Sequence, residues 1–482
     1  MSSAPSLLSF PPEILEYAFE TLVYGVDANE RTLTAMFLSH VCRSFRILAL
    51  DSPQLWTCIS RNSRRPGLQM LATSIERSGN LPLDIGIDAG LLDARTGSER
   101  NLFIDPLIRI VLQHLTRWRS FCFRSAWFTR ENMTMHLMSS VSLQNLVLPA
   151  LEDLTICTEP NPMDDQSRGQ GILSHLGTPF FSLWHMPVLK SFTLKGEHDR
   201  MLPPTAAQYT SQIRELTVRP IWSEWLMGAA PWYITNMTSL STLHLAFDGR
   251  FFQRNLETSY KCELTQDTTL DVEVPACYSS NLYVMSGLAA SPFTRVTFPN
   301  IVSLTLTLHI RSTRGIYPLH GILVNQSSYR LLETLTIIID SEAELSFSER
   351  YTEAGSPLIL LPHCIAPSLK HLNIRSALAL YFASKKGDPQ LDSRFLEESL
   401  VPISLQTITL ELPCVRGVVA WVTELVRVMR DQDCWHTFSE VVVMSGSDEQ
   451  SGTCVVPRDG VQRWCDENEL VWDTSQFDYC HY

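Results

Sequence analysis

The sequence predicts an α/β protein, in which a module of three short helices precedes a long array of short parallel strands with helices between them. In the first sixty residues, apolar side chains recur at helical spacing. After residue 60 a six-residue template, apolar-x-x-apolar-x-apolar, recurs down the chain. The chain has 482 residues, of which 45% are hydrophobic. A chain of this length and composition can bury one large core or several smaller ones.

The N-terminal helices are predicted from apolar stripes and from start signals. A first helix begins at Pro11 or Pro12, because Ser9 can cap it and proline suits a first turn. Its apolar stripe consists of Ile14, Leu15, Ala18, Phe19 and Leu22. A second helix follows the break at residues 25–29, with the stripe Leu33, Phe37, Val41, Phe45 and Leu48. A short third turn runs from Ser52-Pro53 to Leu55-Trp56.

This module carries more apolar surface than three short helices can bury among themselves. Periodicity alone leaves two interpretations open. The helices are either a lead-in that packs on the following domain or a docking module with a partner of its own.

Three segments in order resemble the F-box family as it occurs in fungi: Pro11–Leu15, Leu38–Ala49 and Ser52–Trp56. The resemblance implies an F-box module over residues 7–60. Its apolar helices would dock on a Skp-type adaptor, which binds the cullin of a ubiquitin ligase. The implied adaptor contacts are Pro12, Ile14, Leu15, Val41, Cys42, Phe45, Leu55 and Trp56. Phe10 stands where the family usually has Leu, and Phe45 stands where it often has Trp. Both replacements keep a bulky, apolar side chain.

The repeat array begins its template at nine positions: Leu151, Leu189, Ile213, Leu240, Ile301, Leu332, Leu369, Leu405 and Phe438. The longest interval, 61 residues, is expected to hide one degenerate unit near Leu270–Val274. A proline stands two residues before several templates, as at Pro149 and Pro187, which suits the start of a strand. The pattern resembles an irregular leucine-rich-repeat solenoid over residues 61–482, which implies a target-binding region. A conventional α/β domain with buried parallel strands is the alternative.

Intervals above thirty residues leave room for helices, and three are expected, at Ser376–Lys386, Arg394–Leu400 and Val418–Arg430. Polar segments rich in turn residues predict loops at 159–171, 341–356, 385–391 and 445–457.

Composition disfavours several classes of protein. A net charge of −13 argues against binding to nucleic acid, which relies on Lys and Arg contacts. Since there is no secretory signal and no long apolar run, we expect an intracellular protein, cytoplasmic or nuclear, without a membrane span. The twelve cysteines form no Cys-x-x-Cys pair, which argues against a zinc site or redox dithiol.

No catalytic, cofactor-binding or metal-binding residues are predicted. Asp431, Asp433, Cys434 and His436 follow a helix end and are interpreted as turn residues. Trp222, Trp225 and Trp232 crowd one segment, where they serve core packing or an interface. The resemblance to the F-box family implies a non-catalytic substrate receptor that holds an adaptor, through it a cullin, and an unknown protein target. The alternatives are a scaffold that binds the adaptor without a cullin, or an enzyme of unrecognised type.

Overall fold

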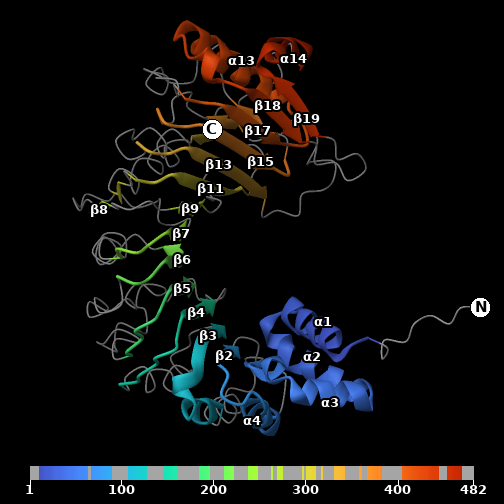
Figure 1. Cartoon of the computed structure of the whole chain (residues 1–482). Helices are drawn as coiled ribbons and strands as arrows, with labels where there is room; N and C mark the ends of the chain where they lie inside the picture. The colour runs from blue at the N-terminus through green and yellow to red at the C-terminus, as the bar shows by residue number, and fades with distance from the viewer. Residues whose placement is uncertain are drawn as a thin grey trace, which may run out of the picture. The chain divides into compact units, whose positions relative to one another are not determined.

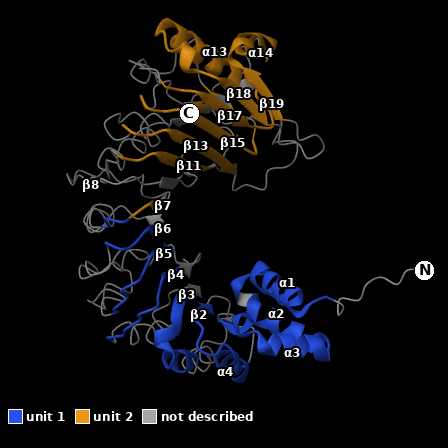
Figure 2. Ribbon diagram, viewed as in Figure 1, with its two compact units in different colours: residues 1–220, 236–239 blue, residues 221–235, 240–482 orange. Residues whose placement is uncertain are grey.

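The computed structural model describes residues 10–62, 67–88, 107–126, 145–159, 184–195, 211–221, 237–247, 262–263, 269–274, 296–297, 300–310, 316–318, 330–341, 358–360, 366–378, 380–382, 404–444 and 453–468. Within these ranges the chain is α/β, with sheets of parallel strands and seven α-helices (Figure 1). The predicted α/β class is confirmed at this level. The chain divides into two compact units, residues 1–220 with 236–239 and residues 221–235 with 240–482 (Figure 2).

Unit 1 begins with the helices α1 (Pro12–Gly25), α2 (Ala28–Val41), α3 (Arg43–Asp51) and the 3₁₀ turn η2 (Pro53–Trp56). They surround a small core of Phe19, Val23, Ala35, Ala49, Leu55 and Trp56. The prediction of one continuous second helix is wrong. Cys42 is extended (φ −157°, ψ 172°) and separates α2 from α3. Its Sγ accepts the N–H of Phe45 at 3.4 Å, so Cys42 caps α3 instead of continuing α2.

The strands of unit 1 are β1 (Cys58–Asn62), β2 (Leu83–Asp88), β3 (Trp118–Ala126), β4 (Asp153–Glu159), β5 (Ser191–Lys195) and β6 (Glu215–Ile221). They pair in parallel, each with its neighbour in sequence. α4 (Leu68–Arg77) follows β1, while a helix at 107–112 and the turn η4 (Leu115–Arg117) precede β3. The boundary expected at residue 60 lies inside β1, and the N-terminal helices share unit 1 with these strands.

Two buried tryptophans tie a helix to the segment that follows it. Trp56 donates its indole N–H to the carbonyl of Ala49, seven residues earlier, at 2.7 Å. Trp118 makes the same bond to Val111, also seven residues earlier, at 3.0 Å. Both rings are 1% exposed, so each bond satisfies an indole N–H that burial would otherwise leave unpaired.

Unit 2 contains a second run of parallel strands in sequence order: β7 (Thr242–Phe247), β9 (Thr269–Val274), β11 (Ser303–Ile310), β13 (Thr334–Ser341), β15 (His371–Ser376), β17 (Thr407–Glu411) and β18 (Glu440–Met444). β19 (Thr453–Pro457) pairs antiparallel with β18. Two small parallel sheets accompany them. One joins β8 (Cys262–Glu263) to β10 (Val296–Thr297), and the other joins β12 (Ile316–Pro318), β14 (Leu358–Leu360) and β16 (Tyr381–Phe382).

Unit 2 also contains α13 (Arg416–Asp431), α14 (Val461–Asn468) and the turns η10 (Trp435–Thr437) and η11 (Arg458–Gly460). The helix predicted over Val418–Arg430 is confirmed, and its stripe of Val418, Val422, Leu425 and Met429 is at most 2% exposed. After α13 the chain turns at Asp433, whose φ of 57° is left-handed. The N–H of Cys434 then bonds to the carbonyl of Met429 at 3.0 Å and closes the helix end.

The nine predicted templates all contribute their last two apolar residues to strands, and Leu270–Val274 lies in β9. Two further element predictions are wrong. Ser376 ends β15 and Tyr381–Phe382 is β16, where a helix was expected, and the loop expected at 445–457 contains β19. The expected helix Arg394–Leu400 and most of the other expected loops lie outside the described residues. Within the described ranges, no helix combines the length and apolar character needed to cross a bilayer.

Candidate docking surface on the N-terminal helices

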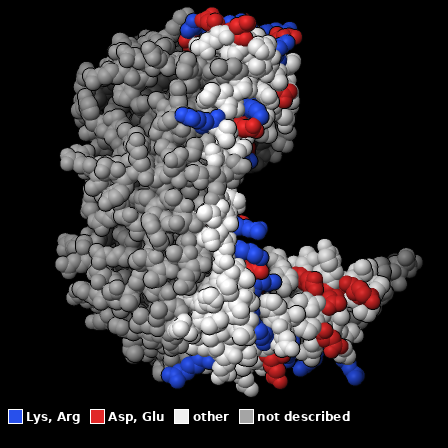
Figure 3. Space-filling view, turned by 60° about the vertical axis from the view of Figure 1, so that its left-hand side comes forward, with Lys and Arg blue, Asp and Glu red and all other residues white. Residues whose placement is uncertain are grey.

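Large apolar side chains are exposed on all three N-terminal helices, although the helices have a core of their own. Ile14 on α1 is 54% exposed, and Val41, the last residue of α2, is 65% exposed. Pro12 is exposed at the start of α1, and Leu15 is half-buried beside it. In Figure 3 this part of the molecule shows uncharged surface with Asp and Glu side chains and a few Lys and Arg side chains among it. These four predicted contact residues are therefore accessible, wholly or in part, to a partner.

The other four predicted contact residues have roles inside the module. Leu55 and Trp56 are each 1% exposed and belong to the core. The Phe45 ring is half-buried and meets the Phe19 ring edge-on, with centroids 4.9 Å apart. Cys42 caps α3 through its thiol. A partner on the helices could touch Phe45 and Cys42 at most in part, and Leu55 and Trp56 hardly at all.

Further apolar residues of the N-terminal module are exposed but were absent from the predicted contacts: Phe10, Tyr17, Leu22, Phe37 and Ile47. On α2, Phe37 and Val41 of the predicted apolar stripe are both 65% exposed. The buried side of α2 instead carries Thr32, Ala35 and Ser39, which are small. Small residues at helical spacing on the opposite side of a helix were the signal in the sequence that could have identified the outward face.

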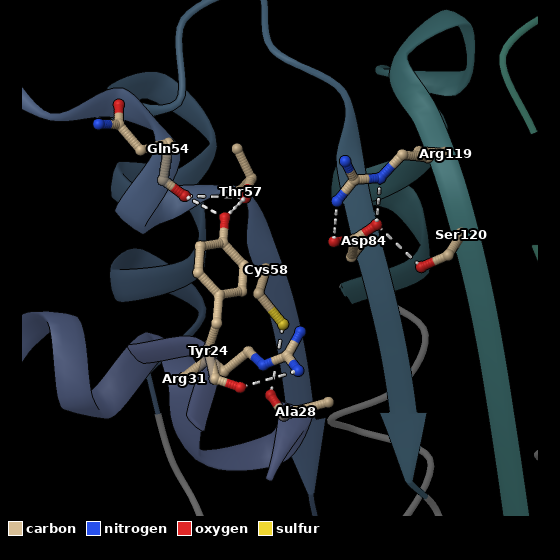
Figure 4. Close-up of polar contacts among 9 residues, drawn as sticks. All are labelled: Tyr24, Ala28, Arg31, Gln54, Thr57, Cys58, Asp84, Arg119 and Ser120. Carbon is tan, nitrogen blue, oxygen red and sulfur yellow. Dashed lines mark hydrogen bonds and ion pairs between the residues drawn. The ribbon is translucent and has the colours of Figure 1, made fainter. Parts of the chain in front are cut away.

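Polar contacts join the helices to the first strands of unit 1 (Figure 4). The Tyr24 hydroxyl lies 3.0 Å from the Gln54 carbonyl and 3.3 Å from the Thr57 hydroxyl. The Thr32 hydroxyl donates to the carbonyl of Cys58 at 2.5 Å, and the Cys58 thiol donates to the carbonyl of Ala28 at 3.3 Å. The end of α1 is thereby fixed against the end of η2, and the start of α2 is fixed against the first residue of β1.

The same junction perturbs one ionisable group. Burial raises the pKa of the Cys58 thiol to about 11, and the nearby Asp84 carboxylate adds to the effect. The Asp84 carboxylate accepts hydrogen bonds from Nε and Nη2 of Arg119 and from the Ser120 hydroxyl (Figure 4). A thiol that is buried and protonated in this way serves as a small hydrogen-bonding core residue.

No group of three or more His, Cys, Asp or Glu side chains in the described residues is arranged to hold a metal ion. Near the end of α13, His436 Nδ1 lies 2.9 Å from the carbonyl of Asp433. The Arg430 guanidinium lies over the Trp435 ring. These contacts stabilise the turn that follows the helix. Trp222, Trp225 and Trp232 lie outside the described residues.

Neither the known family models nor the curated proteins contain a match to this chain.

Proposed function

We propose that this chain is a non-catalytic substrate receptor, in which α1–α3 act as an F-box module and the strand array presents a protein target. The module docks a Skp-type adaptor and, through it, a cullin scaffold, while the chemistry of ubiquitin transfer belongs to other subunits. The strand array is then an irregular leucine-rich-repeat solenoid. The receptor contributes proximity, because it raises the effective concentration of target lysines near the transfer site.

The observation that carries this proposal is the exposure of large apolar side chains on helices that already enclose a core. Ile14, Tyr17, Phe37 and Val41 are each more than half exposed. Complete burial of such a side chain contributes about 1.5–3 kcal/mol, so burial of the exposed half contributes about 1 kcal/mol each. Exposed apolar residues gathered on one small module favour a partner with a complementary apolar surface. An adaptor that receives helices fits this requirement.

The test is co-expression with a Skp-type adaptor and pull-down of three forms of the chain. Wild type should bind, and Ile14→Asp combined with Val41→Asp should abolish binding, because both charges enter the apolar contact. Both positions are more than half exposed, so the double variant should keep the circular dichroism spectrum of the wild type. Val455→Asp on β19 is the matched control, since Val455 is 52% exposed in unit 2, and it should bind like wild type.

Failure of wild type to bind the adaptor would overturn the proposal and leave the helices as a lead-in to the strands. A second arm addresses the scaffold that binds the adaptor without a cullin. Stoichiometric recovery of the cullin with wild type supports the receptor, and recovery of the adaptor alone supports the scaffold.

A further inference from the structure

The outward face of the unit 1 sheet is organised in three rows that run across the strands. The first row joins Asp84, Ser120, Asp153, Ser191 and Glu215, which are register partners on β2 to β6. The second, two residues further along each strand, joins Gly86, Cys122, Thr155, Thr193 and Thr217. The third contains Asp88, Arg124, Cys157 and Lys195. The residues between the rows, such as Phe121, Leu154 and Leu194, are buried on the opposite face.

The two outer rows expose charges of opposite sign. Asp153 and Glu215 are exposed in the first row, and neither makes an ion pair with another residue in the described part of unit 1. Two cations on neighbouring segments pair with other carboxylates: Arg119 binds Asp84, and Lys190 binds Glu152 at 3.0 Å. Arg124 and Lys195 are exposed in the third row. One long edge of the face is thus acidic at Asp153 and Glu215. The other is basic at Arg124 and Lys195, with the half-buried Asp88 beside Arg124 on β2.

The dimensions follow from strand geometry. Strands lie about 4.8 Å apart, so Asp153 and Glu215, two strands apart, are separated by roughly 10 Å, as are Arg124 and Lys195. The outer rows are four residues apart along each strand, which is about 13 Å. The middle row between them holds only glycine, cysteine and threonine, so a partner's backbone can approach the sheet there.

We propose that this three-row face binds an α-helix of a protein partner that lies across the strands, with basic side chains on one flank and acidic side chains on the other. An α-helix is about 10–12 Å wide, which fits between the outer rows, whereas a single extended chain would reach only one row at a time. Seven residues of helix rise about 10.5 Å, which is close to the separation of the two like charges within each outer row. The partner is therefore expected to repeat Lys or Arg, and Asp or Glu, at seven-residue spacing.

The electrostatics of the acidic edge agree with a basic flank. Partial burial raises the pKa of the Asp153 carboxyl, and the neighbouring carboxylates of Glu152, Glu215 and Asp84 raise it further. The ionised Asp153 is thus held against net repulsion in the free protein. A Lys or Arg side chain seated between Asp153 and Glu215 would relieve that repulsion.

This inference rests on the proposed function, since it names the chemistry of the target. Its test, however, needs no adaptor. The probe is a stapled, alanine-based helical peptide of fourteen residues, with Lys at peptide positions 3 and 10 and Glu at 5 and 12. Its control has Lys at all four positions. Binding to the full chain is measured by fluorescence anisotropy at low salt. The two-signed peptide should bind at least tenfold more tightly than the control, and the difference should shrink in high salt.

Charge reversal in the protein separates this interaction from general attraction. Asp153→Lys with Glu215→Lys should weaken binding of the two-signed peptide at least tenfold. Asp459→Lys with Glu467→Lys, exposed positions in unit 2, changes the net charge equally and should have no effect. Adding Arg124→Glu and Lys195→Glu to Asp153→Lys and Glu215→Lys exchanges the signs of the charges on the two outer rows. The fourfold variant should bind the two-signed peptide again, with the peptide helix running in the opposite direction.

Equal binding of both peptides, no binding of either, or no recovery in the fourfold variant would overturn the proposal. Adaptor pull-down with the same variants should match wild type. If the wild type binds the adaptor but neither peptide, this inference fails and the proposed function stands. If the wild type binds the two-signed peptide but not the adaptor, the proposed function fails instead.

Discussion

Replacing Trp56 by phenylalanine should destabilise the N-terminal helices without removing an adaptor contact. Trp56 is 1% exposed, and its indole N–H donates to the carbonyl of Ala49, whose residue is fully buried. Phenylalanine leaves that carbonyl without its donor, which costs about 1–3 kcal/mol. The smaller ring adds a cavity term on the order of 1 kcal/mol, and a weaker contact with the Arg77 guanidinium, 4.5 Å from the indole centroid, adds a few tenths. The expected loss is about 2–4 kcal/mol.

Hydrogen exchange is the suitable assay, because it reports on the N-terminal helices alone in a chain that divides into two compact units. Amides of α1–α3 in Trp56→Phe should exchange roughly 30- to 700-fold faster than in wild type, since each 1.4 kcal/mol is a factor of ten. Trp435→Phe is the matched control. That ring is half-buried, stacks on Phe438 at 5.0 Å and lies near Arg430. Its replacement should cost less than about 1 kcal/mol.

One result would refute the reasoning. If Trp56→Phe left exchange in α1–α3 unchanged but abolished adaptor binding, Trp56 would be a contact residue and the core assignment would be wrong.

Three further outcomes are expected. Asp433→Gly should raise the melting temperature of unit 2 by relieving a left-handed φ, a gain of about 0.5–1 kcal/mol, whereas Asp433→Val should lower it. The Cys58 thiol has a folded pKa of about 11 against an ordinary 9.0, so its contribution is complete below about pH 9 and is lost as pH rises through 11. In urea titrations Cys58→Ala should therefore lack about 2–3 kcal/mol of the alkaline destabilisation that wild type shows. Asp153 has a raised pKa, so its charge disfavours folding once pH exceeds the ordinary carboxyl range. Asp153→Asn should stabilise the free chain by a few tenths of a kcal/mol at pH 7 and change nothing at pH 3, because the site is exposed and screened. A stabilisation of equal size at both pH values would contradict the electrostatic cause.

The strands were predictable from the sequence because the template carries its own burial pattern. In Leu189-Phe192-Leu194, for example, the last two apolar residues are buried on the same face of β5. The first, Leu189, donates its backbone N–H to the carbonyl of Met186 in the turn before the strand. The helix Val418–Arg430 was equally predictable, because one apolar stripe runs its whole length. Each of these elements has a single apolar side. The spacing of its apolar residues therefore predicts both the type of element and the side that is buried.

The sequence does not predict which side of a helix faces the core when two of its sides could be buried. In α2 the large residues Phe37 and Val41 face outward, while Thr32 and Ala35 pack inward because the small core has no room for larger side chains. For the same reason, the sequence does not separate the predicted adaptor contacts that are exposed from those that belong to the core. Ile14 and Trp56 are both apolar in sequence, and only the hydrogen bond from Trp56 to Ala49 and its burial mark it as core. The break at Cys42 was missed because a thiol cap carries no sequence signature.

In each unit, the strands of the parallel ladder lie side by side in the order in which they follow one another along the chain, and this arrangement makes the ladder modular. Duplication or loss of one strand together with its connection would lengthen or shorten the outward face by about 4.8 Å. All remaining neighbours would keep their pairing. A lineage could therefore change the reach of this surface in single steps, without redesigning the helices at the N-terminus.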